Sequence, residues 1–300
     1  MTDTAESSFG AMPVIIIGAG RSGTNMLRDV LTHINGIRTW PCDEINYIWR
    51  YGNRSFETDE FSTEMATPSV CRYIRKQFQL MASNPRESVD EKSNCILLEK
   101  TCANSLRVEF VNAVIPEARY IYLVRDGRDV VASAMKRWKA PLDIPYLAAK
   151  AKYVPKADIP YYASKYFFNR VQKVYNPEAR LGIWGPKFEG WRDTVSTSDL
   201  ATVCAAQWAR CVQRSNQGFT SIAENRVHKL RYEDFVQNPV EHLRAITNFL
   251  EIDVSEQLIS EACGSVSTAS VGKAGRVSKV SDTDFDIMAP MLEALGYQSG

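Results

Sequence analysis

The sequence predicts an α/β protein in which a central parallel β-sheet is flanked by helices. Strand signals occur at 14–17, 95–99, 119–124 and 227–231, and each is followed by a helical pattern. Such alternation is typical of parallel strands joined by crossover helices. The chain has 300 residues, 45% of them hydrophobic, and shows no internal repeat or Gly/Ser-rich linker. We therefore expect a single domain with one large core. The expected helices cover 23–33, about 70–81, 103–114, 128–138 and 239–250.

The first strand leads into a glycine-rich loop and a helix, in the segment PVIIIGAGRSGTNMLRDVL at 13–31. Its β-branched run is typical of a strand buried on both faces. Gly18, Gly20 and Gly23 allow the backbone to turn sharply and to approach a ligand closely. Exposed N–H groups and the positive end of the helix dipole then favour an anion, most naturally a phosphate. The polar side chains at this point are Ser22, Thr24 and Asn25.

Three interpretations of this loop are open. A P-loop, G-x-x-x-x-G-K-[ST], needs a lysine where this chain has Thr24, so a small-molecule kinase would need Mg²⁺ and a variant loop. The dinucleotide pattern G-x-G-x-x-G is present, with Asp43 and Glu44 about 20 residues on, but the intervening GIRTWPC is a poor strand. Neither pattern accounts for Arg21 inside the loop. A glycine-rich turn that binds no ligand is the third possibility.

A second strand, turn and helix occur in YIYLVRDGRDVVASAMKRW at 120–138. Arg125 stands where the strand ends, and Ser133 lies eight residues later on the helix. Ligands of open parallel sheets bind outside the carboxyl ends of the strands, so Arg125 is placed to reach an anion that Ser133 also touches. The other charged residues of the turn, which we expect to be solvated, are Asp126, Arg128 and Asp129.

These two segments together resemble the nucleotide-binding motifs of the sulfotransferases that use 3′-phosphoadenosine 5′-phosphosulfate (PAPS). RSGT at 21–24 resembles their 5′-phosphosulfate loop, and Arg125 with Ser133 resembles their 3′-phosphate motif. LLEKTCANSLR at 97–107 resembles the EKT or EKS segment of the same superfamily. The resemblance spans about 14–297 and implies a P-loop-like sulfotransferase fold with PAPS as co-substrate and no metal.

The resemblance also implies which residues bind the nucleotide. Arg137 falls where some members add a cationic contact. Tyr232, in KLRYEDFVQNP, falls at a position that often touches the nucleotide. VGKAGRVSK at 271–279 resembles the C-terminal loop that closes over PAPS, without its fuller glycine and tryptophan pattern. The implied set is Gly20, Arg21, Ser22, Gly23, Thr24, Asn25, Arg125, Ser133, Arg137, Tyr232, Lys273 and Arg276.

Sulfuryl transfer needs fixed positive groups where charge develops, and a base for the acceptor. Arg21 is expected to stabilise the leaving phosphate. Lys100, at the end of its strand, is expected to stabilise the bridging oxygen. Glu44 lies where protein-tyrosine and heparan sulfotransferases carry their catalytic glutamate, so the resemblance favours it as the base. Glu99 is the alternative base, or it braces Lys100. Asp43 and His33 are the less favoured candidates.

The segment 139–193 is rich in proline and aromatic residues. Long insertions of this kind are often lids or substrate-binding loops, although each aromatic side chain taken alone more often fills a subsidiary core. We expect the insertion to line an acceptor pocket opposite Glu44, Lys100 and Arg21. The expected acceptor is a hydroxyl or amine of a small molecule, lipid or glycan. The aromatic character favours an amphiphilic or ring-bearing hydroxyl over a highly charged polysaccharide.

Composition excludes several other classes. A net charge of +1 argues against bulk binding of nucleic acid or an anionic membrane. No apolar stretch is long enough to span a bilayer, and the polar N-terminus lacks a signal-peptide pattern, so we expect residues 1–12 to be disordered and the location to be cytoplasmic. The seven cysteines form no C-x-x-C pair and the three histidines no spaced cluster, which predicts no metal site.

Two less favoured functions stay open on the sequence. A dehydrogenase would use the G-x-G-x-x-G pattern, but the pairing of Arg125 with Ser133 has no role in binding NAD. A non-catalytic module could keep the nucleotide-binding residues without the reaction. The sequence does not indicate an oligomeric state.

Overall fold

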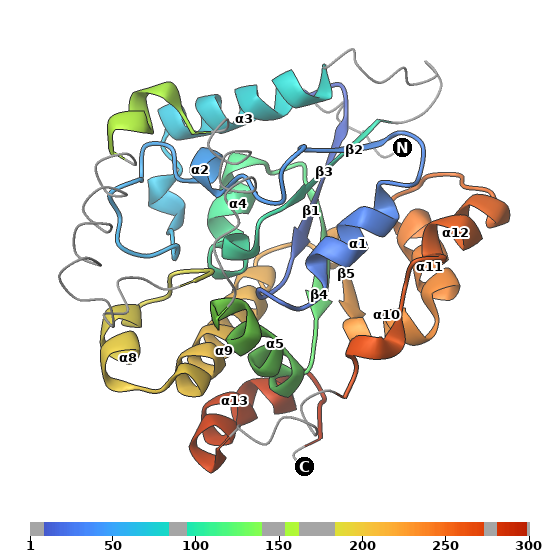
Figure 1. Ribbon diagram of the computed structural model, residues 1–300. Coiled ribbons are helices and arrows are strands. Elements are labelled where there is room, and N and C mark those ends of the chain that lie inside the picture. The colour runs from blue at the N-terminus through green and yellow to red at the C-terminus, as the bar shows by residue number, and fades with distance from the viewer. Residues whose placement is uncertain (1–8, 84–94, 140–153, 162–183, 273–280, 299–300) are drawn as a thin grey trace.

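A computed structural model describes residues 9–83, 95–139, 154–161, 184–272 and 281–298. Five strands form one sheet in the order β2-β3-β1-β4-β5, and every neighbouring pair is parallel (Figure 1). This confirms the predicted α/β class with a central parallel sheet. The strands are β1 (Met12–Ile17), β2 (Ile37–Thr39), β3 (Ile96–Lys100), β4 (Arg119–Val124) and β5 (Val227–Arg231).

Helices follow the strands along the chain, as the alternating pattern predicts. The described α-helices are α1 (Thr24–Leu31), α2 (Asn46–Trp49), α3 (Pro68–Ala82), α4 (Val108–Val114), α5 (Gly127–Lys139), α8 (Trp191–Thr197), α9 (Leu200–Phe219), α10 (Tyr232–Gln237), α11 (Pro239–Phe249), α12 (Glu256–Cys263) and α13 (Asp282–Ala294). Short 3₁₀ turns are η1 (Thr63–Met65), η2 (Cys102–Leu106), η3 (Lys156–Asp158), η4 (Glu224–Arg226) and η5 (Thr268–Ser270). None of the described helices is both long and apolar enough to cross a membrane.

The sheet has an apolar core on each face, because successive side chains of a strand point to opposite sides. Val14 and Ile16 of β1 pack with α1, α10, α11 and α12 on one face. Ile15 and Ile17 pack with α3, α4, α5, α9 and α13 on the other. Figure 1 shows these two helical layers on either side of the sheet. All strands being parallel, their carboxyl ends meet at one edge, which brings together the residues after β1, β3 and β4.

The structure corrects two predicted element boundaries. GIRTWPC, which has poor strand character, contains the short strand β2, whose Ile37 pairs with Ile96 of β3. The helix expected at 103–114 is interrupted at Arg107, which has φ −148° and ψ 41° between η2 and α4. The Arg107 side chain is buried and donates to Asn104 Oδ1 at 2.9 Å. This side-chain anchor accompanies the break in the helix.

The segment expected to be disordered, 1–12, is longer than the structure indicates, because residues 9–12 are described. Residues 1–8 lie outside the described residues. Phe9 is buried and its ring centroid lies 6.0 Å from that of Phe78, and Ala11 is also buried. Burial of an aromatic ring stabilises the packed chain, so the ordered region begins before residue 13.

Candidate active site

The loop after β1 turns tightly against the rest of the sheet. Arg21 has φ +73° and Gly23, the N-cap of α1, has φ +93°. A Cβ at Gly23 would lie 2.4 Å from the Tyr232 ring, and one at Gly18 would lie 2.7 Å from the Leu123 carbonyl oxygen. Glycine is therefore required at Gly23 for its backbone conformation and for its contact with Tyr232. The loop ends in the N–H groups of α1, which face outward at the carboxyl edge of the sheet.

Arg21 joins the two predicted phosphate motifs. Its Nε donates to the Ser133 hydroxyl of α5 at 3.0 Å. Its carbonyl oxygen accepts from Nη1 of Arg125 at 3.2 Å. Arg21 is an exposed residue whose guanidinium is partly desolvated; this partial desolvation is the main cause that lowers its pKa, and the nearby positive charges of Arg137 and Arg125 lower it further. Several guanidinium groups thus lie close together at one end of the sheet, which favours an anionic ligand there.

Arg125 is held from three sides and is only 5% exposed. Its guanidinium lies 4.2 Å from the centroid of the Tyr232 ring, a cation–π contact. Its Nη2 is 3.5 Å from Oδ2 of Asp129. The same Oδ2 accepts from the Gly272 backbone N–H at 2.9 Å. The predicted 3′-phosphate motif is thereby connected to the segment that precedes Lys273.

The expectation of a solvated turn after Arg125 is wrong for Asp129. This residue is 4% exposed and lies one helical turn after Arg125, so its carboxylate compensates a buried positive charge. Asp126 and Arg128 form a half-buried pair of their own at 2.7 Å, in addition to the Asp126 N–H bond to Glu233 Oε1. The spacing of four residues between Arg125 and Asp129 was the signal available in the sequence.

Lys100 and Glu44 lie together at the end of β3. Lys100 Nζ is 3.4 Å from Oε1 of Glu44, and the Lys100 side chain is 2% exposed against 24% for Glu44. The same Oε1 accepts from the Cys102 backbone N–H at 3.3 Å. The pKa of Lys100 is raised: burial, the largest influence, lowers it, but nearby groups, among them the carboxylates of Glu44 and Asp43, outweigh burial. Lys100 is therefore a charged ammonium at neutral pH.

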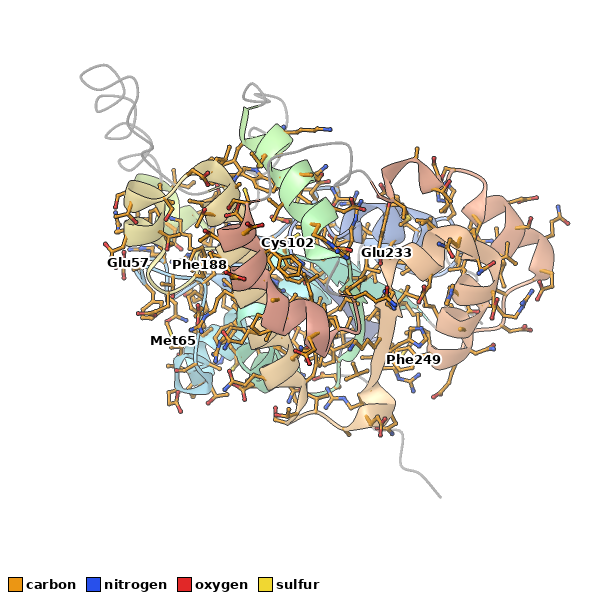
Figure 2. The ribbon with its side chains drawn as sticks, turned by 90° about the horizontal axis from the view of Figure 1, so that it is seen from below. Glu57, Met65, Cys102, Phe188, Glu233 and Phe249 are labelled. Carbon is orange, nitrogen blue, oxygen red and sulfur yellow. The ribbon has the colours of Figure 1, made fainter. Side chains whose placement is uncertain are left out.

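Cys102 links this pair to the first loop. Its Sγ lies 3.7 Å from Oγ1 of Thr24 at the start of α1. Figure 2 shows Cys102 near the middle of the molecule, between the side that carries Glu57 and Phe188 and the side that carries Phe249. Burial raises the pKa of the Cys102 thiol to about 12. A thiol with this pKa is neutral and is not a nucleophile at neutral pH.

Glu99 differs from Glu44 in its surroundings. It is 1% exposed and accepts from the Thr101 hydroxyl at 2.5 Å and from Asn104 Nδ2 at 3.0 Å. Burial raises the pKa of Glu99 to about 7, although the Thr101 hydrogen bond lowers it. The donors of these hydrogen bonds are Thr101 and Asn104, whereas Lys100 acts on Glu99 through its positive charge, which lowers the pKa of Glu99. That Glu99 braces Lys100 stays a prediction, with this electrostatic interaction as its link.

The less favoured base candidates are engaged elsewhere. Asp43 pairs with Arg28 Nη1 at 3.0 Å and accepts from Asn25 Nδ2 at 3.3 Å. His33 Nδ1 lies 2.7 Å from the Asp29 carbonyl oxygen, next to the last turn of α1. Asp43 thus fixes the chain next to Glu44 against α1. Lys273 and Arg276 lie outside the described residues.

Of the aromatic insertion, the described residues are 139, 154–161 and 184–193. The Trp184 ring lies 3.8 Å from the position that a Cβ on Gly20 would take. The Trp184 and Pro186 carbonyl oxygens each accept from Gln207 Nε2 at 2.9 Å, which fixes this segment on α9. Trp184 is therefore placed against the phosphate-loop residue next to Arg21. Phe188 and Trp191 are buried in the core.

Within the described part of the chain, no three His, Cys, Asp or Glu side chains gather in a way that could hold a metal ion.

The sequence did not indicate Thr101 or Asp129 as residues that hold the candidate site in place. Thr101 is fully buried and accepts from the Ile45 backbone N–H at 3.1 Å. It stands next to Lys100 in the EKT segment, but its contact with Ile45 depends on the pairing of distant segments.

Known structures share this fold. The sulfotransferase domain of the Synechococcus PCC 7002 olefin synthase matches with a TM-score of 0.55 and 13% identity, over 97% of this chain and 96% of that one. Sulfotransferase STF9 from Mycobacterium avium matches with a TM-score of 0.54 and 12% identity, over 96% and 78% of the two chains. The sulfotransferase domain from the curacin biosynthetic pathway matches with a TM-score of 0.52 and 14% identity, over 96% of this chain and 98% of that one. No curated protein matches the sequence.

The sequence itself matches the family profile of the sulfotransferase domain over residues 12–284. This match covers nearly the whole chain and includes both loop motifs, Lys100 and Glu44. The chain therefore belongs to the sulfotransferase domain family.

Proposed function

We propose that this protein transfers the sulfuryl group of PAPS to a hydroxyl or amine of a small-molecule, lipid or glycan acceptor. The observation that carries the proposal is the position of Arg21 between Ser133 and Arg125, at the N-terminus of α1. Family membership supports the reaction class. The pair formed by Glu44 and Lys100 supplies the remaining chemistry nearby.

The residues present fit a nucleotide with phosphates at both ends of its ribose. Arg21 and the first N–H groups of α1 are assigned to the 5′ end, where the loop turns. Arg125 and Ser133 are assigned to the 3′-phosphate, with Arg137 as a further cation. Desolvation is the largest cause of the lowered Arg21 pKa, and Arg137 and Arg125 lower it further; the closeness of these guanidinium groups supports the fit, because an anion would relieve their repulsion. The remaining proposed contacts are Gly20, Ser22, Gly23, Thr24, Asn25, Tyr232, Lys273 and Arg276.

PAPS, when bound, supplies an activated sulfuryl group whose S–O bond to the 5′-phosphate breaks as a bond from the acceptor oxygen or nitrogen to sulfur forms. The electron pair of the broken bond goes to the 5′-phosphate, so the products are the sulfated acceptor and 3′-phosphoadenosine 5′-phosphate (PAP). Arg21 and Lys100 are fixed cations placed for the charge that develops. Because both are held by other groups before the reaction, little reorganisation is needed.

We assign the general base to Glu44 rather than Glu99. The Glu44 side chain is 24% exposed and lies beside Lys100, so an acceptor can reach it. Glu99 is 1% exposed and both of its oxygens accept hydrogen bonds from buried groups. A base must come within hydrogen-bond reach of the proton that it removes, directly or through one water. Glu44 takes the acceptor proton and releases it to solvent after transfer.

On the acceptor side we propose that Trp184 forms part of the wall. Its ring lies against Gly20, next to Arg21. A flat apolar ring at this place supports a ring-bearing or amphiphilic acceptor over a highly charged polysaccharide. The kinase interpretation is not favoured, because the P-loop lysine position is Thr24, whose hydroxyl lies at 3.7 Å from the buried Cys102 thiol.

Binding and transfer experiments test this proposal. We expect the protein to bind PAP, and to bind ATP and NAD much more weakly, as measured by calorimetry. Transfer from radiolabelled PAPS should continue in EDTA, because cationic side chains stand where a kinase uses Mg²⁺. A screen of acceptors by mass spectrometry, scored by the mass of one added sulfuryl group, then identifies the acceptor class. Preferential binding of ATP and a rate abolished by EDTA would contradict the proposal.

A further inference from the structure

Thr101 connects two segments that lie far apart in the sequence. Its hydroxyl is fully buried; it accepts from the Ile45 backbone N–H at 3.1 Å and donates to Glu99 Oε1 at 2.5 Å. A threonine hydroxyl has one proton and two lone pairs. Because the proton is given to Glu99, a lone pair is directed toward Ile45. Glu99 thus sets the orientation of the hydroxyl that fixes the Ile45 backbone.

Glu99 is itself held in place by a buried chain of polar groups. Asn104 Nδ2 donates to Glu99 Oε2 at 3.0 Å. Arg107 donates to Asn104 Oδ1 at 2.9 Å and, through Nη2, to Asn46 Oδ1 at 2.6 Å. Thr101 therefore binds Ile45, and Arg107 binds Asn46. Ile45 and Asn46 directly follow Glu44 in the chain.

The Glu44 carboxylate is held by the residues on either side of Thr101. Oε1 of Glu44 lies 3.4 Å from Lys100 Nζ and 3.3 Å from the Cys102 backbone nitrogen. Thr101 stands between these two residues and holds the backbone one position after Glu44. The carboxylate and its backbone are therefore fixed to the same short segment at the end of β3. A shift of about 1 Å in a reacting group is enough to cost on the order of 100-fold in rate.

We propose that Thr101 and Glu99 are positioning residues that hold Glu44 in its place beside Lys100. Neither touches the acceptor; both act through the backbone at Ile45. The inference rests on the proposed function, in which Glu44 is the base. It also gives Glu99 a role in the reaction other than that of an alternative base.

The test replaces Thr101 by Val, which keeps the shape of the side chain and removes the hydroxyl. The matched control is Thr247→Val, because Thr247 is also buried, at 2% exposure, and its hydroxyl donates to the Arg244 carbonyl oxygen at 2.9 Å in α11. Turnover of radiolabelled PAPS is measured in two reactions. In one, 2-naphthol is the probe acceptor; in the other, 2-naphthol is left out and water is the acceptor. Affinity for PAP is measured by calorimetry.

For Thr101→Val we expect kcat to fall about 10- to 100-fold with the affinity for PAP changed less than about twofold. Thr101→Ser, which restores a hydroxyl, should recover most of kcat. Thr247→Val should lower Tm to a similar extent while keeping wild-type kcat. The Ile45 amide should exchange its hydrogen faster in Thr101→Val than in the wild type or Thr101→Ser.

Two results would overturn the inference. Wild-type kcat and wild-type Ile45 exchange in Thr101→Val would show that Thr101 does not position Glu44. If Thr101→Val does not fold, Glu99→Gln takes its place, because a glutamine has one acceptor oxygen for the two donors, Thr101 and Asn104; unchanged kcat in that variant would have the same meaning. The variant Glu44→Gln distinguishes a wrong assignment of the base from a wrong assignment of Thr101. If that variant keeps wild-type kcat, Glu44 is not the base, and the inference fails with it.

Discussion

Arg21 Nε donates to the Ser133 hydroxyl at 3.0 Å, although the two residues are 112 positions apart. This hydrogen bond joins the loop after β1 to the helix after β4, which are the two segments that the sequence assigns to opposite ends of one nucleotide. Ser133 therefore holds Arg21, and in the proposed function it also binds the 3′-phosphate. The two proposed phosphate sites are thus joined by a direct contact, and we expect a change at one to affect the other.

Replacing Arg125 by Met should weaken binding of PAP through the 3′-phosphate. Loss of a charge-assisted contact costs about 1.5–3 kcal/mol, or roughly 10- to 100-fold in affinity. The control ligand is 5′-AMP, which lacks the 3′-phosphate and should lose much less. Calorimetry with both nucleotides measures the difference. Equal losses for the two would show that Arg125 does not recognise the 3′-phosphate.

Glu44→Gln should reduce turnover about 10²- to 10⁴-fold, the usual contribution of a general base, with affinity for PAP nearly unchanged. Glu117→Gln is a matched control, because Glu117 also has a side chain 24% exposed and is paired with a cation, Arg75, at 2.7 Å. Steady-state transfer to 2-naphthol measures the effect. A Glu44→Gln variant no slower than Glu117→Gln would remove Glu44 as the base.

The stability of the protein should depend on pH through Glu99. Burial raises the pKa of Glu99 to about 7 from its ordinary value of 4.5. The folded state therefore binds this proton more tightly, and its contribution to stability is complete below pH 4.5 and is lost as the pH rises through about 7. Glu99→Gln removes this loss, so its free energy of unfolding relative to the wild type should rise by about 2–3 kcal/mol between about pH 5 and pH 8. Chemical denaturation at the two pH values measures it; a difference independent of pH would contradict the shifted pKa.

Asp129→Asn should destabilise the protein more than Asp126→Asn, although both remove a charge from one turn. Asp129 faces the buried Arg125, and its loss leaves that cation without its carboxylate, which costs about 3 kcal/mol or more. Asp126 pairs with Arg128, whose side chain is 28% exposed, so its loss should cost less than about 1 kcal/mol. Thermal unfolding of the two variants gives the comparison. Equal Tm values would mean that Arg125 is compensated by other groups.

The main parts of the fold could be predicted because their signals are local. The run at 14–17 is β-branched and apolar, which favours a strand whatever its neighbours are. β5 lies at 227–231, as predicted. β2 could not be found in this way, because its three residues form a strand only through pairing with β3. The helix predicted at 103–114 is only partly correct, because the buried side chain of Arg107 has distant partners.

For the candidate site, the sequence by itself determined the chemistry that is available: arginines at the ends of two strands, a glycine-rich turn, and a lysine and two glutamates within reach. Only the tertiary structure decided how those groups differ. Glu44 and Glu99 have the same side chain, but Glu99 points into a buried polar network while Glu44 stays partly exposed beside Lys100. Asp129 has the sequence surroundings of a surface residue and is buried against Arg125. The physical reason is that burial and hydrogen-bond partners come from segments far apart in the chain, whereas strand and turn preferences come from adjacent residues.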